Sequence, residues 1–205
     1  MDMRGLSLVS MRACCVALAL HLATTQPAQA CACCSSTAFR NVEVEALTPR
    51  RVADIDRMTF AGPAKIASGE ADPEIKGIAD PASDYQLTVT RAKDRMVFSF
   101  RDEKGRAGTL TLVMPKMISI FEVDPRGEEK DRGLGPSLYK EWKLTANAAG
   151  DGLFRGIVGA GQKITLVLHG RGNSCTSPDQ FTDWTLLVHG KERLTLYGAL
   201  DSAGK

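Results

Sequence analysis

Apolar and polar residues alternate in short runs along most of the chain after residue 38, and glycine, aspartate and proline separate these runs. A period of two is typical of half-buried β-strands, whereas an amphipathic helix repeats every 3.6 residues. The alternation therefore predicts about ten short strands. The runs comprise residues 39–47, 58–67, 85–91, 95–101, 109–114, 117–123, 138–146, 153–158, 163–169, 181–189 and 193–200.

Local signals refine this pattern. Residues 49–56 break the alternation and are compatible with a short helix. Pro63 predicts a bend or bulge in the run 58–67, because proline cannot donate a hydrogen bond to a central ladder. Residues 102–105 read as a turn that makes the flanking runs a hairpin. The fold class that follows is all-β: a single antiparallel β-barrel or β-sandwich of about ten strands.

The first thirty residues have the pattern of a secretory signal peptide that is removed on export. Arg4 and Arg12 form a weakly basic start, and residues 13–23 form an apolar run that is too short to span a bilayer stably. Residues 28–30 read Ala-Gln-Ala, a small-x-small cleavage site. We therefore expect cleavage after Ala30.

Cleavage there would make Cys31 the first residue of the mature protein, which raises the alternative of a lipid anchor on its thiol. The positions before a lipidated cysteine usually hold leucine and a small residue, whereas Ala28 and Gln29 stand here. Soluble export to the periplasm or the medium is therefore favoured, and membrane contact is expected only if Cys31 is lipidated. The expected parts of the chain are a signal peptide at 1–30, a cysteine-rich tail at 31–38 and an all-β domain at 39–205.

The charge balance excludes one class of partner. The chain has 26 basic and 24 acidic side chains and a formal net charge of +2. Domains that bind nucleic acid normally carry a strongly basic face. We expect no nucleic-acid partner. The partners that the sequence suggests are a metal ion or a small apolar molecule, and it identifies no protein partner.

Four cysteines follow the predicted cleavage site: Cys31, Cys33, Cys34 and Cys175. In an oxidising compartment the default fate of an even set is disulfide formation, and four cysteines allow three pairings. A bond between the adjacent Cys33 and Cys34 would be strained and is the least favoured. The most economical arrangement joins one tail cysteine to Cys175, although all four remain disulfide candidates.

Two tail thiols would remain after such a bridge. Closely spaced thiolates are soft ligands that favour Cu(I) or Zn over Mg or Ca. His169 is a further candidate ligand, because it leads directly into the segment that contains Cys175. The metal site that this predicts comprises Cys31, Cys33, Cys34 and His169. Cys31 and Cys34 also form a C-x-x-C pair, but it lacks the βαβ context of thiol oxidoreductases.

His169 and His189 end two similar runs, TLVLHG and TLLVHG. We interpret these as two strand ends of the same kind, since repeat architectures need at least about three copies to build a core. If the two strands are antiparallel neighbours, the histidines lie at opposite edges of the sheet, about 20 Å apart. A site formed by both histidines is then not expected.

Aromatic residues offer a second candidate ligand site. Trp142, Trp184 and Phe98 lie in predicted strands and would line the cavity of a barrel that carries a small apolar molecule. The alternative is that these side chains simply fill the core, which is the commoner fate of large apolar residues.

An enzyme is the least favoured class. The segment 169–175 resembles the nucleophile segment of exported cysteine transpeptidases. However, Asn173 and Ser174 stand directly before Cys175 where those enzymes have His-Gly, and no arginine follows at the expected place. Cys175 also has three potential disulfide partners, which argues against a free nucleophile. The sequence contains no nucleophile elbow, P-loop or zinc-protease motif.

Three stretches resemble a family of exported bacterial proteins whose mature chains begin with CACC. They are CACC at 31–34, LYKEW at 138–142, and RGNSC at 171–175 with Trp184 behind it. The resemblance implies export and one all-β domain, and it carries over no activity. We therefore expect a non-enzymatic binding protein that holds a soft metal on its N-terminal cysteines. The alternative is a carrier of a small apolar ligand whose cysteines only form disulfides.

Overall fold

The computed structural model describes residues 40–68, 83–123, 138–159, 161–172, 177–189 and 194–201. Within these residues lie ten strands, one α-helix and one 3₁₀ turn. In chain order they are β1 (Arg40–Ala46), α2 (Pro49–Asp56), β2 (Thr59–Ser68), β3 (Ser83–Ala92), β4 (Arg95–Asp102), β5 (Ala107–Val113), β6 (Met117–Val123), β7 (Tyr139–Gly152), β8 (Gln162–Arg171), η2 (Pro178–Gln180), β9 (Phe181–His189) and β10 (Leu194–Asp201). The predicted all-β fold class is confirmed.

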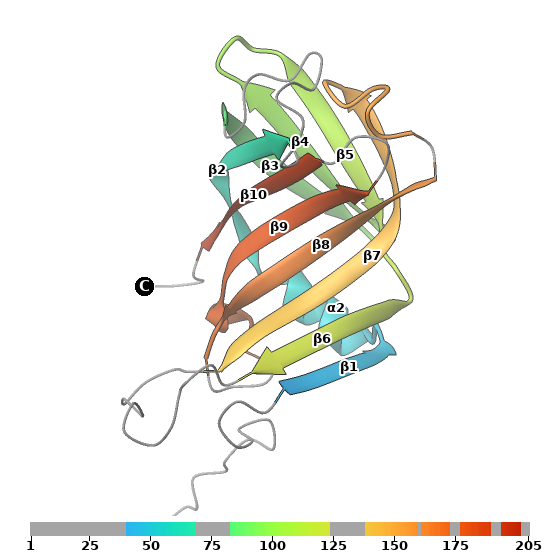
Figure 1. Cartoon of the computed structure of the whole chain (residues 1–205), viewed down its shortest axis with the longest axis vertical. Coiled ribbons are helices and arrows are strands. Elements are labelled where there is room, and N and C mark those ends of the chain that lie inside the picture. The colour runs from blue at the N-terminus through green and yellow to red at the C-terminus, as the bar shows by residue number, and fades with distance from the viewer. Residues whose placement is uncertain are drawn as a thin grey trace, which may run out of the picture. The chain divides into compact units, whose positions relative to one another are not determined.

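The ten strands form one antiparallel sheet in the order β1-β6-β7-β5-β4-β3-β2-β10-β9-β8, and a further pairing of β8 with β7 closes it. Eight strands, from β7 round to β8, therefore make a closed barrel, and β6 and β1 continue the sheet beyond it (Figure 1). β7 serves both parts. It pairs with β6 from Tyr139 to Lys143 and with β5 from Ala148 to Gly152. We call the eight strands the barrel, and β1, β6 and α2 with the first half of β7 the extension.

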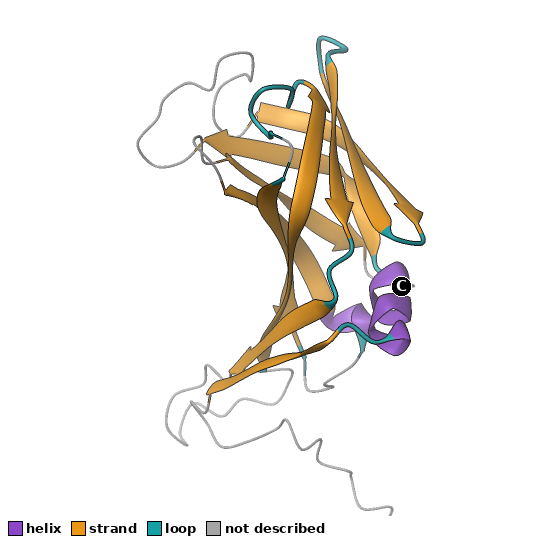
Figure 2. Cartoon of the chain, turned by 90° about the vertical axis from the view of Figure 1, so that its right-hand side faces the viewer, coloured by secondary structure: helices purple, strands orange, loops and turns teal. Residues whose placement is uncertain are grey.

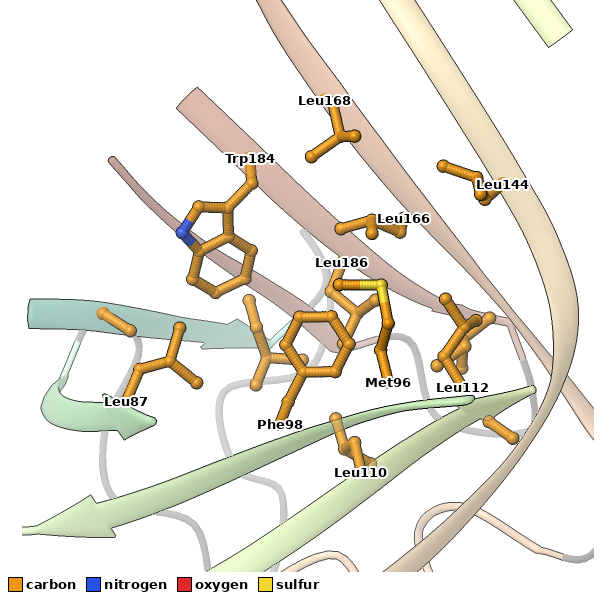
Figure 3. Packing of buried hydrophobic residues seen from close by; sticks show 14 of the residues in the cluster. Leu87, Met96, Phe98, Leu110, Leu112, Leu144, Leu166, Leu168, Trp184 and Leu186 are labelled. Carbon is orange, nitrogen blue, oxygen red and sulfur yellow. The ribbon is translucent and has the colours of Figure 1, made fainter. Parts of the chain in front are cut away.

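Inward-facing side chains from opposite walls meet inside the barrel. In β4 every second residue is buried, and Phe98 is completely inaccessible to solvent. Figure 3 shows Phe98, Met96 and Leu110 from β4 and β5 lying toward Leu166 and Leu186 from β8 and β9. The alternation that predicted the strands therefore also fills the barrel, because one face of each strand is apolar.

Among the described residues, α2 rather than a facing strand covers the inner face of the extension. Thr48 caps its first turn by accepting a hydrogen bond from the Arg51 backbone N–H, and Pro49 occupies the first helical position, where no N–H is needed. Ile55 is fully buried in the core, and the Arg51 guanidinium lies 4.7 Å from the ring of Trp142. Figure 2 shows the helix beside the lower part of the curved sheet.

Two local predictions are confirmed. β2 bulges at Gly62 and Pro63: its pairing with β10 steps from Ala64 to Phe60 while β10 advances only from Gly198 to Leu200. β4 and β5 form the predicted hairpin, and Gly105 in its turn has a φ of +78°. Glycine adopts this left-handed conformation without steric cost.

The predicted strand at residues 153–158 is wrong. β7 continues as far as Gly152, and the following residues form turns. Gly152 has a φ of +61°, and a Cβ there would lie 2.2 Å from the carbonyl oxygen of Ala107, so only glycine fits. The chain then turns inward, and Phe154 is fully buried with its ring centre 5.4 Å from that of Phe100.

Several sequence predictions fall outside the described residues. They concern the signal peptide at 1–30, the tail at 31–38, and the cysteines Cys31, Cys33, Cys34 and Cys175.

Candidate functional site

The outer face of β7, β8 and β9 brings together polar residues that are distant in sequence. Residues paired across neighbouring strands project from the same face of a sheet. Glu141 of β7 is paired with His169 of β8, and His169 is paired with Asp183 of β9. In the next row on this face, Lys143 is paired with Val167.

β8 forms the floor of a groove in this face. Thr165 and Val167 point outward, yet they are only 8% and 6% exposed, because side chains from β7 and β9 rise on both sides. The groove has a volume of about 470 Å³, and Tyr139, Lys143 and Leu187 contribute to its walls. Sites for small organic ligands commonly measure about 300–1,000 Å³, so the groove has a suitable size for such a ligand.

Both histidines line this groove, and each is bonded to a threonine of the neighbouring strand. Thr165 Oγ1 lies 3.0 Å from His189 Nε2, and Thr185 Oγ1 lies 3.4 Å from His169 Nε2. Thr165 also shares a hydrogen bond of 2.9 Å with Thr145 of β7. The two TxxxH runs are thus related by a local twofold axis. The two runs do end antiparallel neighbouring strands, and by strand rise the histidines lie about 20 Å apart. No site formed by both was expected at that separation, yet both line this one groove.

Glu141 holds a hydrogen-bonded cluster beside His169. The Tyr139 hydroxyl donates to Glu141 Oε1 at 2.5 Å, and Lys143 Nζ lies 2.6 Å from Glu141 Oε2. Burial and the bond to Glu141 raise the pKa of Tyr139 far above its usual value. Burial alone would raise the pKa of Glu141, but the hydrogen bonds from Lys143 and Tyr139 outweigh it and lower this pKa. At neutral pH the cluster therefore presents a phenol and a paired carboxylate.

A second pocket of about 440 Å³ adjoins the groove over β9, β10 and β2. His169 and Thr185 line both hollows, so the two lie side by side on this face. The second pocket lies beside the bulge of β2, and Pro63 and Gly198 are among its lining residues. We refer to both hollows together as the outer groove.

The three aromatic residues predicted to line a cavity are all completely buried. Phe98 and Trp184 pack with Phe60, and their ring centres lie 6.3 Å apart. Trp142 lies in the extension, 4.6 Å from the ring of Phe181. Trp184 also lines the second pocket from below, while Trp142 and Phe98 line neither hollow of the outer groove.

Of the predicted metal ligands, only His169 lies within the described residues. These residues contain no group of three or more histidine, cysteine, aspartate or glutamate side chains that could hold a metal ion. Glu141 and Asp183 share a register row with His169, but they are engaged with Tyr139, Lys143 and Thr182 instead.

Sequence reasoning missed the outer groove, although one signal for it was present. Residues 164–168 of β8, Ile-Thr-Leu-Val-Leu, are all buried, which means that this strand is covered on both faces. A near-continuous apolar run, which here only Thr165 interrupts, is typical of such a strand. The paired TxxxH runs were a second signal, because their symmetry brings each threonine to the other run's histidine.

No family model, curated protein or solved structure matches the chain. Within the described residues, no helix has the length and apolar character needed to cross a membrane.

Proposed function

We propose that this chain is an exported, non-enzymatic binding protein whose ligand occupies the outer groove. The ligand class is a small, largely apolar molecule that carries one or two hydrogen-bonding groups. The observation that carries the proposal is that two adjacent hollows of ligand size share His169 and Thr185 in their walls. Val167 and Leu187 offer apolar contact, and histidine, threonine and tyrosine side chains offer donors and acceptors.

The filled barrel supports an outer site over an interior one. Phe98, Leu166 and Leu186 belong to one buried cluster, and their side chains are inaccessible to solvent. A ligand inside the barrel would have to displace such side chains, whereas the outer groove is already open. Burial of an apolar ligand against Val167 would be favourable by about 25 cal/mol for each Å² removed from water.

The test is the binding of 8-anilinonaphthalene-1-sulfonate, an apolar fluorophore with one polar group, measured by its fluorescence with the purified protein. Thr185→Phe should fill the junction of the two hollows and weaken binding at least about tenfold. Thr88→Phe places the same side chain on an exposed position of β3, outside the outer groove, and should leave binding unchanged. Equal binding by both variants would place the probe elsewhere and contradict the proposal.

A second candidate function is soft-metal binding by the N-terminal cysteines, and the strand register favours it. Arg40, Val123, Tyr139 and Arg171 form one row across β1, β6, β7 and β8. Three strand spacings separate Arg40 from Arg171, about 14 Å. Cys34 precedes Arg40 by six residues, and Cys175 follows Arg171 by four. The two segments that carry these cysteines therefore join the sheet at the same end of its strands. Each is long enough to cover that distance or most of it.

Native mass spectrometry with Cu(I), with Zn(II) and without metal tests this candidate, and thiol counting with and without reductant accompanies it. One bridge to Cys175 with one metal ion per chain is the expected result. Replacing Cys33 and Cys34 by serine should abolish metal uptake, whereas Thr185→Phe should not affect it. Two intact disulfides and no bound metal would contradict this candidate and leave the outer groove untouched.

A further inference from the structure

β1 ends the sheet on one side and has a free edge. Its only strand partner among the described residues is β6, which it meets over Arg40–Ala46. Backbone N–H and C=O groups on the other edge of β1 therefore have no strand to pair with in the described part of the chain. Such an edge is a template for a further strand unless side chains or covering segments protect it.

The side chains of β1 are apolar on one face and acidic on the other. Val42 and Val44 project from the outer face and are 67% and 63% exposed. Their register neighbours are Phe121 and Ser119 of β6. A strand added beyond β1 would bury the two valines by cross-strand contact, which is favourable for apolar and β-branched pairs.

Glu43 and Glu45 lie on the inner face and set the charge that a further strand must carry. Glu45 is paired with Arg51, 2.9 Å away. No described cation lies within ion-pair distance of Glu43, although its charge acts on Glu122 and helps to raise the pKa of that buried carboxyl. A strand beside β1 would therefore place a side chain next to an uncompensated carboxylate, and a lysine or arginine is favoured there.

A second copy of β1 does not meet this requirement. Two antiparallel copies keep their valines on a common face only in registers that place Glu43 opposite Glu43, Glu45 or Asn41 of the other copy. Like charges directly opposite each other are destabilising. The Asn41 register brings no like charges together, but it too gives Glu43 no cationic partner, so a basic strand suits this edge better than a second copy of β1 does.

We propose that the free edge of β1 binds an extended peptide segment in which lysine or arginine alternates with apolar residues. The peptide adds one strand to the sheet, so that its basic residue faces Glu43 and its apolar residues cover Val42 and Val44. Backbone hydrogen bonds supply affinity, and the alternating side chains supply specificity. This surface is separate from the outer groove, which begins two strands away at β7.

The probe is a fluorescently labelled peptide of sequence Thr-Val-Lys-Val-Lys-Val-Thr with blocked ends, and binding is measured by fluorescence anisotropy. A peptide with glutamate in place of lysine tests the charge, and a peptide with the same residues in scrambled order tests the alternation. The lysine peptide should bind at least about fivefold more tightly than either comparison peptide. Hydrogen exchange should show protection of β1 amides when it binds, as expected for strand addition.

Glu43→Lys should reverse the preference, so that the glutamate peptide binds better than the lysine peptide. Glu103→Lys, in the exposed turn between β4 and β5, is the matched control and should keep the original preference. The proposal is overturned if the lysine peptide does not bind, or if Glu43→Lys leaves the preference unchanged. It is equally overturned if sedimentation shows a dimer that Val44→Lys dissociates, because a second copy would then occupy the edge.

Discussion

In the barrel, the inner face of the sheet meets other strands of the same sheet, and its buried side chains are leucines and aromatic residues such as Phe98 and Trp184. In the extension, the inner face meets α2 instead. The three buried charged side chains among the described residues, Asp54, Glu122 and Lys140, all belong to the extension. The closed part of the sheet therefore has an apolar interior, whereas the open part contains the buried charged side chains.

The charges of the extension are held by partners from several elements. Lys140 stands opposite Glu122 in the register of β6 and β7, and its charge acts on that buried carboxyl. Its ammonium group donates to Gln180 Oε1 at 2.7 Å and lies 5.5 Å from the ring of Phe181. A buried charge is costly unless it is paired and hydrogen-bonded. A helix that covers one side of an open sheet can leave room for such a network. The facing strands of a closed barrel instead fill the space between them with apolar side chains.

The largest expected effect is in the barrel. Phe98→Ala should lower the free energy of unfolding by about 4 kcal/mol, because it leaves a cavity between Phe60 and Trp184. Urea denaturation measures this loss, and Phe98→Leu should cost much less because it retains more volume. A loss below about 1 kcal/mol for Phe98→Ala would mean that the interior holds free space, and a ligand inside the barrel would regain support.

A somewhat smaller loss is expected in the extension. Lys140→Met should cost about 3 kcal/mol, because it removes one of the two cationic side chains whose charges act on the buried Glu122 carboxylate. The double variant Lys140→Met with Glu122→Gln should recover most of this loss, since no buried charge then lacks a partner. Urea denaturation of the single and double variants measures both values. Full additivity of the two substitutions would show that the two side chains do not interact, and the contrast between the regions would fail.

The strands of both regions were predictable from the sequence, whereas their arrangement was not, for a physical reason. Strand alternation is a local signal, and it located ten strands, the bulge at Pro63 and the hairpin after Asp102. It failed at residues 153–158, where apolar residues enter the core from a turn rather than from a strand. Periodicity cannot distinguish these cases, because Phe154 is buried either way. The identity of the edge strand depends on how the strands pair, and the pairing cannot be read from the sequence.

The outer groove was hidden for the same reason. Thr165, Val167 and His169 look like the ordinary outward positions of a strand until β7 and β9 are placed beside them. The predicted aromatic residues were conspicuous in the sequence because they are large, and the structure places them in the core. Prediction of a surface groove requires pairings between distant residues, and composition carries no such information.

A still smaller effect should follow from loosening the helix that covers the extension. Thr48→Ala removes the hydroxyl that accepts from the Arg51 N–H at 3.3 Å, and should cost about 1 kcal/mol. Thr48→Ser keeps a capping hydroxyl and should be close to the wild type. Thermal unfolding followed by circular dichroism measures both variants. If Thr48→Ala is as costly as Lys140→Met, α2 contributes more to the extension than the charge network does.

The smallest expected effect concerns how the stability of the extension depends on pH. Burial raises the pKa of Glu122 above its ordinary value of 4.5, against the opposing charges of Lys140 and Arg51. The folded chain therefore holds this proton more tightly than the unfolded chain. The stability that Glu122 contributes is complete below about pH 4.5 and is lost as the pH rises through the folded-state pKa. Glu122→Gln removes this loss, because glutamine does not titrate.

The free energy of unfolding of wild type and Glu122→Gln, measured by urea denaturation between about pH 4 and pH 7, tests this sign. The wild type should lose stability relative to the variant as the pH rises, and Glu103→Gln in the exposed turn is the control. The cost of removing the Glu122 charge from beside Lys140 shifts the variant's curve as a whole and does not produce this slope. A wild type that gains stability relative to the variant with rising pH would mean that Lys140 and Arg51 outweigh burial. The surroundings of Glu122 in the extension would then favour its ionised form. The extension would differ from the barrel in stabilising a buried charge, and not only in containing charged side chains.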